Sequence, residues 1–200
     1  MRNFAANLRT TVSVGFQSTT TTFDGLKGYC FDSPLRNFAS SVETVFDGRL
    51  DQHGNARPRA RVHLDGEAPG KLKATYVIKA FEESGDFSID RFNDTYSPYK
   101  TYVGLRTPAM KDYDESLMTD QRHQFEVVTV NEKGVATDAQ RVHVKIYKLK
   151  WHWWYESDDQ DLYTQIAQSG TIAVKDTILS TKKGKSSFHF KAKHEEYGRY

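Results

Sequence analysis

Two short motifs resemble catalytic ones, and each lacks a part that its chemistry needs. His194–Gly198 (HEEYG) begins like a zinc metalloprotease motif, but Gly198 stands where the second histidine must come one helical turn later. Gly184–Ser186 (GKS) resembles the end of a phosphate-binding loop, but Leu179 stands where the first glycine of that loop belongs. The serine-hydrolase pattern Gly-x-Ser-x-Gly does not occur. We therefore expect no catalytic residue and no cofactor, and we interpret Gly184–Ser186 as a hairpin turn.

Side chains that could bind a metal do not have the spacing of a metal site. None of the seven histidines pairs with another at the helical spacing i, i+4. His63 and His143 lie at alternate positions of expected strands, so we expect them to face solvent or a strand edge. Cys30 is the one cysteine, which leaves neither an intramolecular disulfide nor a pair of thiols for zinc. We expect no metal site in this chain.

Four clustered carboxylates are better explained by a helix than by calcium. They are Glu156, Asp158, Asp159 and Asp161. The spacing and the turn glycine of a calcium loop are missing, whereas carboxylates in a first helical turn are favoured by the helix dipole. Ser157 and Gln160 have the spacing of a capping box. The sequence therefore predicts a short surface helix that ends near Gly170.

An aromatic cluster is the candidate contact site of the chain. The residues concerned are Trp151, Trp153, Trp154 and Tyr155. Exposed aromatic side chains hold sugars or partner proteins in many binding modules. The apolar face of the preceding stretch changes between Ile146 and Tyr147, which indicates a bulge or a strand that moves between sheets. Core or interdomain packing and ligand contact both stay open for this cluster.

The residues named above lie on or between expected β-strands. Apolar and polar residues alternate along short runs separated by Gly, Asn and Asp turns, the pattern of half-buried antiparallel strands. The expected strands are 11–16, 41–50, 60–64, 72–81, 86–92, 124–130, 140–154, 172–180 and 186–192. We therefore expect an all-β protein.

An internal repeat indicates two domains. The pattern Gly-x-Ala-x4-Arg-Val-His begins at Gly54 and recurs 80 residues later at Gly134. In each copy we expect a strand, a glycine turn and a returning strand. Two prolines and a glycine within Pro98–Pro108 indicate the boundary. The prediction is two immunoglobulin-like or fibronectin-type antiparallel β-sandwiches in tandem, at residues 1–104 and 105–200, with the short helix inserted in the second.

Charge is balanced in both halves. Residues 1–104 contain 13 Lys and Arg against 12 Asp and Glu, and residues 105–200 contain 15 against 14. A nucleic-acid or anionic-membrane surface normally shows a regional basic excess. No run of about 20 apolar residues is available to span a bilayer. We expect no nucleic-acid partner and no direct membrane insertion.

Several segments resemble the bacterial alpha-2-macroglobulin family in order and spacing. These segments are Phe81–Asp90 (FEESGDFSID), Tyr96–Leu105 (YSPYKTYVGL), Val144–Ser157 (VKIYKLKWHWWYES) and Glu196–Tyr200 (EYGRY). The resemblance implies consecutive macroglobulin domains from the N-terminal or middle part of a large bacterial protein, periplasmic or anchored to the cell envelope. Proteins of this family are endopeptidase inhibitors in which cleavage of a bait region triggers collapse around the protease, and a Cys-Gln thioester couples to it.

This chain departs from the family pattern at its reactive parts. Cys30 is followed by Phe31–Ser33, not by the Glu-Gln of a thioester, and no bait region is recognisable. The resemblance thus implies a non-catalytic structural module whose partners are neighbouring domains of the same parent and, through the parent, proteases. The alternative is a glycan- or protein-binding module that uses Trp151–Trp154. A hydrolase with an unrecognised site is the third hypothesis, for which no nucleophile, base and orienting group can be named.

Overall fold

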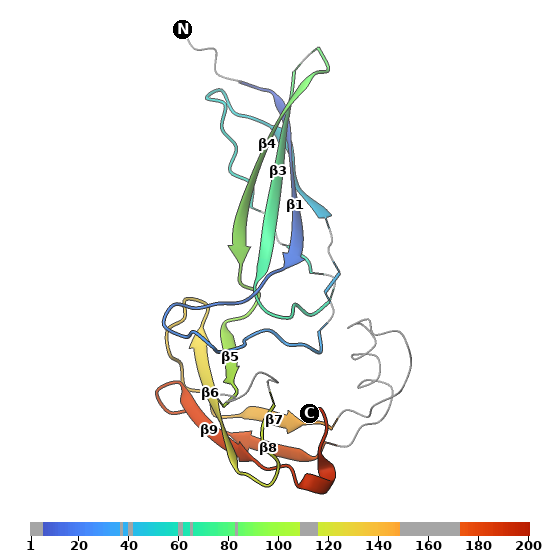
Figure 1. Cartoon of the computed structure of the whole chain (residues 1–200). Helices are drawn as coiled ribbons and strands as arrows, with labels where there is room; N and C mark the ends of the chain where they lie inside the picture. Colours follow the sequence, from blue (N-terminus) through green and yellow to red (C-terminus); the bar gives the residue numbers. More distant parts are fainter. Residues whose placement is uncertain are drawn as a thin grey trace, which may run out of the picture. The chain divides into compact units, whose positions relative to one another are not determined.

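The computed structural model describes residues 6–36, 38–39, 42–59, 62–64, 66–82, 84–108, 116–148 and 173–200. Within these ranges the elements are β1 (Arg9–Ser18), β2 (Val42–Arg49), β3 (Leu72–Phe81), β4 (Phe87–Tyr96), β5 (Thr101–Arg106), β6 (His123–Asn131), β7 (Val142–Ile146), β8 (Lys175–Leu179), β9 (Lys185–Phe190) and the short 3-10 helix η1 (His194–Glu196) (Figure 1). All paired strands are antiparallel. The all-β prediction is confirmed, and the expected helix lies outside the described residues.

The chain divides into two compact units. The first comprises Met1–Thr20 and Arg36–Pro98, and the second comprises Thr21–Leu35 and Tyr99–Tyr200. The segment Thr21–Leu35 thus belongs to the second unit, although residues of the first unit precede and follow it in sequence. The expected division differs at this segment, and a cut after Gly104 would pass through β5.

The first unit is built on one four-stranded sheet in the order β2-β1-β3-β4 (Figure 1). β1 and β3 pair over ten residues, from Arg9↔Phe81 to Ser18↔Leu72. Alternate side chains of a strand point to opposite faces, and one face of this sheet carries the core. Its fully buried side chains are Val14, Phe16, Leu72 and Ala74. In the first unit, these side chains give the sheet one buried face.

The second unit contains two sheets among its described residues, β5-β6-β9 and β7-β8. The middle strand β6 is covered on both faces, because Val127, Val128, Thr129 and Val130 are each at most 3% exposed. Val128 and Val130 belong to one apolar cluster, and Val127 packs with Val142 and Phe188 in another. Two clusters on opposite faces of β6 make it the central strand of this unit.

The turns of the sequence repeat have the same hydrogen bonds. Asp51 Oδ1 accepts the N–H groups of residues 53 and 55, at 2.8 Å each. Asn131 Oδ1 accepts those of residues 133 and 135, at 3.0 Å each. Gly54 and Gly134 follow with φ of 76° and 81°, in the left-handed region that glycine adopts without strain. The repeated turn is therefore confirmed.

The two copies of the repeat differ after the turn, because only the second copy continues into a paired strand. Val142 begins β7 and pairs with β8 through Val142↔Leu179. In the first copy, residues 62–64 lie outside every strand, so the predicted strand 60–64 is wrong for these described residues. A short run of strand-forming residues is not stable without a neighbour to hydrogen-bond to.

β5 was missed because Gly104 was interpreted as an interruption. Tyr102 and Gly104 of β5 are buried, and the strand pairs with β6 through Gly104↔Val128. A Cβ at position 104 would lie 2.5 Å from Phe31 Cε1 and 2.9 Å from Val128 Cγ2. Glycine in a strand often marks such a close approach. The residue is a packing requirement of the strand, not its end.

Gly104→Ala should lower the free energy of unfolding by about 1–3 kcal/mol, because the added methyl group overpacks the core beside Phe31. The change should be cheaper in a Phe31→Leu background, where the ring edge no longer occupies that space. Urea unfolding of the four proteins of this double-mutant cycle measures both values. An equal cost in both backgrounds would show that Phe31 is not what excludes a side chain at position 104.

Candidate functional site

The aromatic cluster predicted as a contact site lies outside the described residues. This applies to Trp151, Trp153, Trp154 and Tyr155, and to the carboxylates between residues 156 and 161. Their packing or ligand contact stays a prediction.

The two motifs that resembled catalytic ones occupy ordinary structural positions. His194 begins the 3-10 helix η1, and its backbone N–H donates to Asp120 Oδ2 over 3.3 Å. Lys182 and Lys185 exchange two backbone hydrogen bonds of 3.0 Å, and Lys183 and Gly184 between them have φ of 52° and 68°. Two consecutive positive φ values are typical of the tight turns that join hairpin strands. The predicted hairpin turn is confirmed.

His63 and His143 each lie beside a carboxylate among the described residues. His143 Nε2 contacts Asp176 Oδ1 across the β7–β8 pair, with both side chains about half exposed. The His63 backbone N–H donates to Glu43 Oε2 over 3.3 Å. Across the described ranges, no three His, Cys, Asp or Glu side chains converge as a metal site would require.

No helix in those ranges has the length and apolar character needed to cross a membrane.

The segment Thr21–Leu35, which we call the clip, supplies half of an apolar cluster in the second unit. The cluster consists of Phe23, Leu26, Tyr29 and Phe31 from the clip and Tyr99, Tyr102, Val128 and Val130 from β5, β6 and the approach to β5. The Phe23 ring lies 4.8 Å from that of Phe31 and 5.4 Å from that of Tyr102, both in edge-on geometry. Such aromatic pairs add to the stabilisation from burial. The clip is therefore part of the core of this unit.

Backbone and side-chain hydrogen bonds hold the clip in place. Cys30 and Leu105 exchange backbone hydrogen bonds of 2.8 and 2.9 Å, so the clip pairs with the edge of β5. The Thr21 N–H donates to the Asp32 carboxylate over 3.0 Å, which ties the start of the clip to its later part. The clip was not predicted from the sequence because its Gly and Asp residues indicate only turns, although the four apolar residues that it contributes to the cluster were a signal of burial.

Tyr29, Arg106 and Glu126 form a polar cluster between the clip and the sheet. The Tyr29 hydroxyl donates to Glu126 Oε2 over 2.8 Å, and the Arg106 guanidinium binds the same oxygen. The guanidinium carbon lies 4.7 Å from the centre of the Tyr29 ring, close enough for a cation–π contact. A shallow pocket of about 280 Å³ beside them is smaller than the usual site for an organic ligand.

The protonation states of Glu126 and Tyr29 indicate a structural role for this cluster and not a role in acid–base catalysis. The hydrogen bond from Tyr29, with further help from Arg106, lowers the pKa of Glu126 below its ordinary value. Desolvation and the hydrogen bond to Glu126 raise the pKa of Tyr29. At neutral pH the glutamate is an ionised acceptor and the tyrosine a neutral donor. The cluster therefore joins the clip to β5 and β6, and neither group is poised to transfer a proton.

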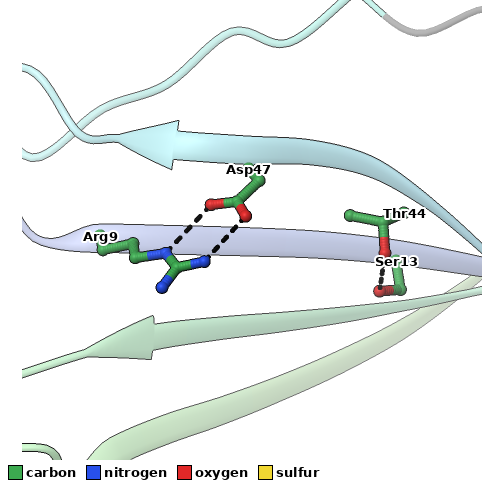
Figure 2. Close-up of polar contacts among 4 residues, drawn as sticks. All are labelled: Arg9, Ser13, Thr44 and Asp47. Carbon is green, nitrogen blue, oxygen red and sulfur yellow. Dashed lines mark hydrogen bonds and ion pairs between the residues drawn. The ribbon is translucent and has the colours of Figure 1, made fainter.

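A second candidate contact surface is the outer face of the sheet β2-β1-β3-β4 in the first unit. This face lies opposite the face that carries the core of the unit. Strand register places these residues on it: Arg9, Thr11, Ser13, Gly15, Gln17, Val42, Thr44, Asp47, Arg49, Lys73, Thr75, Val77, Lys79, Phe81, Phe87, Ile89, Arg91, Asn93 and Thr95. Figure 2 shows Arg9 and Asp47 joined by two hydrogen bonds, of 3.1 and 2.9 Å, and Ser13 beside Thr44 at 3.4 Å. These contacts bridge β1 and β2. The outer face is thus an ordered polar surface with exposed Phe87 and Ile89 on it.

In the variant Glu126→Gln, the free energy of unfolding should decrease less between neutral and acid pH than in the unmodified protein. Because the folded protein lowers the pKa of Glu126, its contribution is present above the ordinary carboxyl value of about 4.3 and is lost as the pH falls through the lowered value. Urea midpoints measured between neutral and acid pH test this. Asp47 and Asp51 also have lowered pKa values, so a smaller slope should remain. An unchanged acid limb in the variant would contradict the assignment.

Tyr29→Phe should act at the opposite end of the pH range. The raised pKa of Tyr29 means that its contribution is complete below the ordinary tyrosine value of about 10 and is lost as the pH rises through the raised value. The variant should be less stable at neutral pH and lose less stability between neutral and strongly alkaline pH. Parallel curves for the two proteins would show that the hydroxyl does not bind Glu126 in solution.

The comparisons with known proteins agree with this architecture. Residues 104–200 match the family model of bacterial macroglobulin domain 6. Native Escherichia coli alpha-2-macroglobulin has a similar fold, with a TM-score of 0.51 and 13% identity over 94% of this chain and 12% of that chain. Trypsin-activated E. coli alpha-2-macroglobulin gives a TM-score of 0.57 at 13% identity, over 94% of this chain and 13% of that one.

A mutant of Salmonella alpha-2-macroglobulin gives a TM-score of 0.51 at 14% identity, over 94% of this chain and 13% of that chain. No curated protein matches the chain in sequence. At these identities the likeness shows the fold, and this chain spans only a small part of each of the three proteins. The resemblance inferred from the sequence is thereby confirmed: residues 104–200 match the model of bacterial macroglobulin domain 6, and the chain has the fold of the corresponding part of bacterial alpha-2-macroglobulins.

Proposed function

We propose that this chain is a non-catalytic structural module of a larger bacterial protein that traps proteases. The observation that carries the proposal is the match of residues 104–200 to bacterial macroglobulin domain 6, together with the fold likeness over 94% of the chain. One of the similar structures is an alpha-2-macroglobulin activated by trypsin. The partners of this module would be neighbouring domains of its parent and, through the parent, proteases.

The structure offers a physical basis for a mechanical role. The chain enters the second unit at Thr21, returns to the first at Arg36, and enters the second again at Tyr99. Each unit is therefore tied to the other at three points of the chain. Aromatic packing and paired hydrogen bonds hold the clip, so the module is suited to transmit force between domains.

We propose that the parent acts in the bacterial periplasm or at the cell envelope.

A parent protein that traps proteases should give a particular pattern of inhibition. Trypsin incubated with the parent protein should lose activity on a large protein substrate but keep it on a small peptide, because an enclosed protease still has an open active site. The chain of 200 residues alone should neither inhibit trypsin nor hydrolyse a substrate panel. Inhibition of both substrates by the parent would indicate an active-site inhibitor, and turnover by the isolated chain would indicate an enzyme.

A pair of variants links this pattern to the module. Phe31 is 7% exposed and Leu35 is 50% exposed, and both lie in the clip. Phe31→Ala should destabilise the module by about 3–5 kcal/mol and weaken trapping by the parent. Leu35→Ala is the matched control and should leave trapping intact. Equal trapping by both variants would contradict a role for the clip.

The ligand-binding alternative rests on the cluster Trp151–Trp154, which lies outside the described residues. Titration with a panel of glycans, followed by tryptophan fluorescence, separates it from the structural role. Saturable quenching by one glycan class would favour the alternative, and an unchanged spectrum is the result that the structural role predicts.

A further inference from the structure

The two faces of the sheet in the first unit carry opposite charges. The outer face carries five basic side chains, Arg9, Arg49, Lys73, Lys79 and Arg91, and one carboxylate, Asp47. The core face has Glu43, Asp90 and Asp94 in the same register and no Lys or Arg. Random placement would mix the signs on each face. The basic excess of the outer face is hidden in the balanced charge of the chain as a whole.

Most of these cations have no carboxylate partner. Arg9 forms a two-point ion pair with Asp47, and the hydrogen bond from Arg9 lowers the pKa of this carboxylate. No described carboxylate lies within ion-pair distance of Arg49, Lys73, Lys79 or Arg91. Four positive charges on one face therefore remain uncompensated within the described part of the chain.

An apolar group lies among these charges. The rings of Phe81 and Phe87 pack at 5.7 Å, and Ile89 follows Phe87 on the same face. Phe87 is 51% exposed and Ile89 is 47% exposed. Arg9 lies over the Phe81 ring and Lys79 over the Phe87 ring, both at 5.6 Å. Aromatic side chains beside arginine are the composition that protein interfaces favour.

Several other modes of binding fit this face less well. Addition of a strand to the edge strand β4 is opposed by Asp90 and Asp94, which accept the N–H groups of Arg91 and Thr95 at 2.8 and 2.7 Å. Two copies of the face would repel each other in a symmetric dimer. Stacking of nucleic-acid bases is hindered because a cation already covers one side of each phenylalanine ring.

We propose that the outer face docks an acidic protein surface with an apolar centre. The carboxylates of this partner would pair with Lys73, Lys79, Arg49 and Arg91. The apolar residues of the partner would cover Phe87 and Ile89. Charge complementarity of this kind sets the orientation and the association rate of a complex. The inference rests on the proposed structural role, and it adds the chemistry of the partner that this module would receive.

The test uses the whole chain and defined probes. The main probe is a fluorescent peptide that alternates glutamate with phenylalanine and valine, and its control has lysine in place of glutamate. The acidic peptide should bind, and more weakly as salt is added. A double charge reversal, Lys73→Glu with Arg91→Glu, should weaken binding by about tenfold or more. Arg57→Glu with Arg59→Glu changes the net charge equally, outside the sheet, and should leave binding unchanged.

Other outcomes overturn the proposal. These are no binding of the acidic peptide, equal binding of the basic peptide, and loss of binding in the Arg57/Arg59 control. Tighter binding of a thymidine oligonucleotide, or of phosphatidylglycerol vesicles, would assign the face to nucleic acid or membrane. Circular dichroism of each variant checks that the fold is kept. Failure of this test leaves the trapping assay unaffected, because that assay does not depend on the outer face.

Discussion

The close approach of Phe31 to Gly104 is the contact on which the second unit depends. Phe31 belongs to the clip, and its ring occupies the space that any side chain at position 104 would need. Through this contact a segment that precedes β2, β3 and β4 completes the core of β5 and β6. Burial of aromatic rings supplies the favourable free energy, and the backbone pairing of Cys30 with Leu105 fixes the register of the clip. Neither the clip nor β5 has this environment without the other.

Because the clip belongs to the core of the second unit, the two units do not simply follow one another in the sequence. The chain passes between the two units at three places, whereas two domains in tandem would be joined by a single linker. Tyr29, Arg106 and Glu126 add a polar attachment at the margin of the apolar cluster. The first unit contributes a different surface, its basic outer face, which leaves its core face to pack internally. A clip packed into the core of the second unit and an exposed charged face on the first suit the proposed role of a module that contacts other domains.

Sequence patterns predicted most of the strands because their alternation is local. Leu72–Phe81 was predicted with the bounds that β3 has, and the repeated turns at Gly54 and Gly134 were found from spacing alone. The clip and β5 were not predicted: the apolar residues of the clip signalled burial, but the packing of Phe31 against Gly104 arises between residues distant in sequence. The outer face was missed for a related reason. Its charges come from four strands, and only their register places them together.

The dependence of the second unit on the clip can be measured from the stability of this unit with and without the clip. Two proteins would be compared by urea unfolding and by hydrogen exchange of β6: residues 99–200 alone, and the same residues joined through a flexible linker to residues 21–35. We expect the shorter protein to have no cooperative transition and no protected amides in β6, and we expect the clip to restore both. Equal cooperative unfolding of the two proteins would contradict this dependence, because the second unit would then have a complete core of its own.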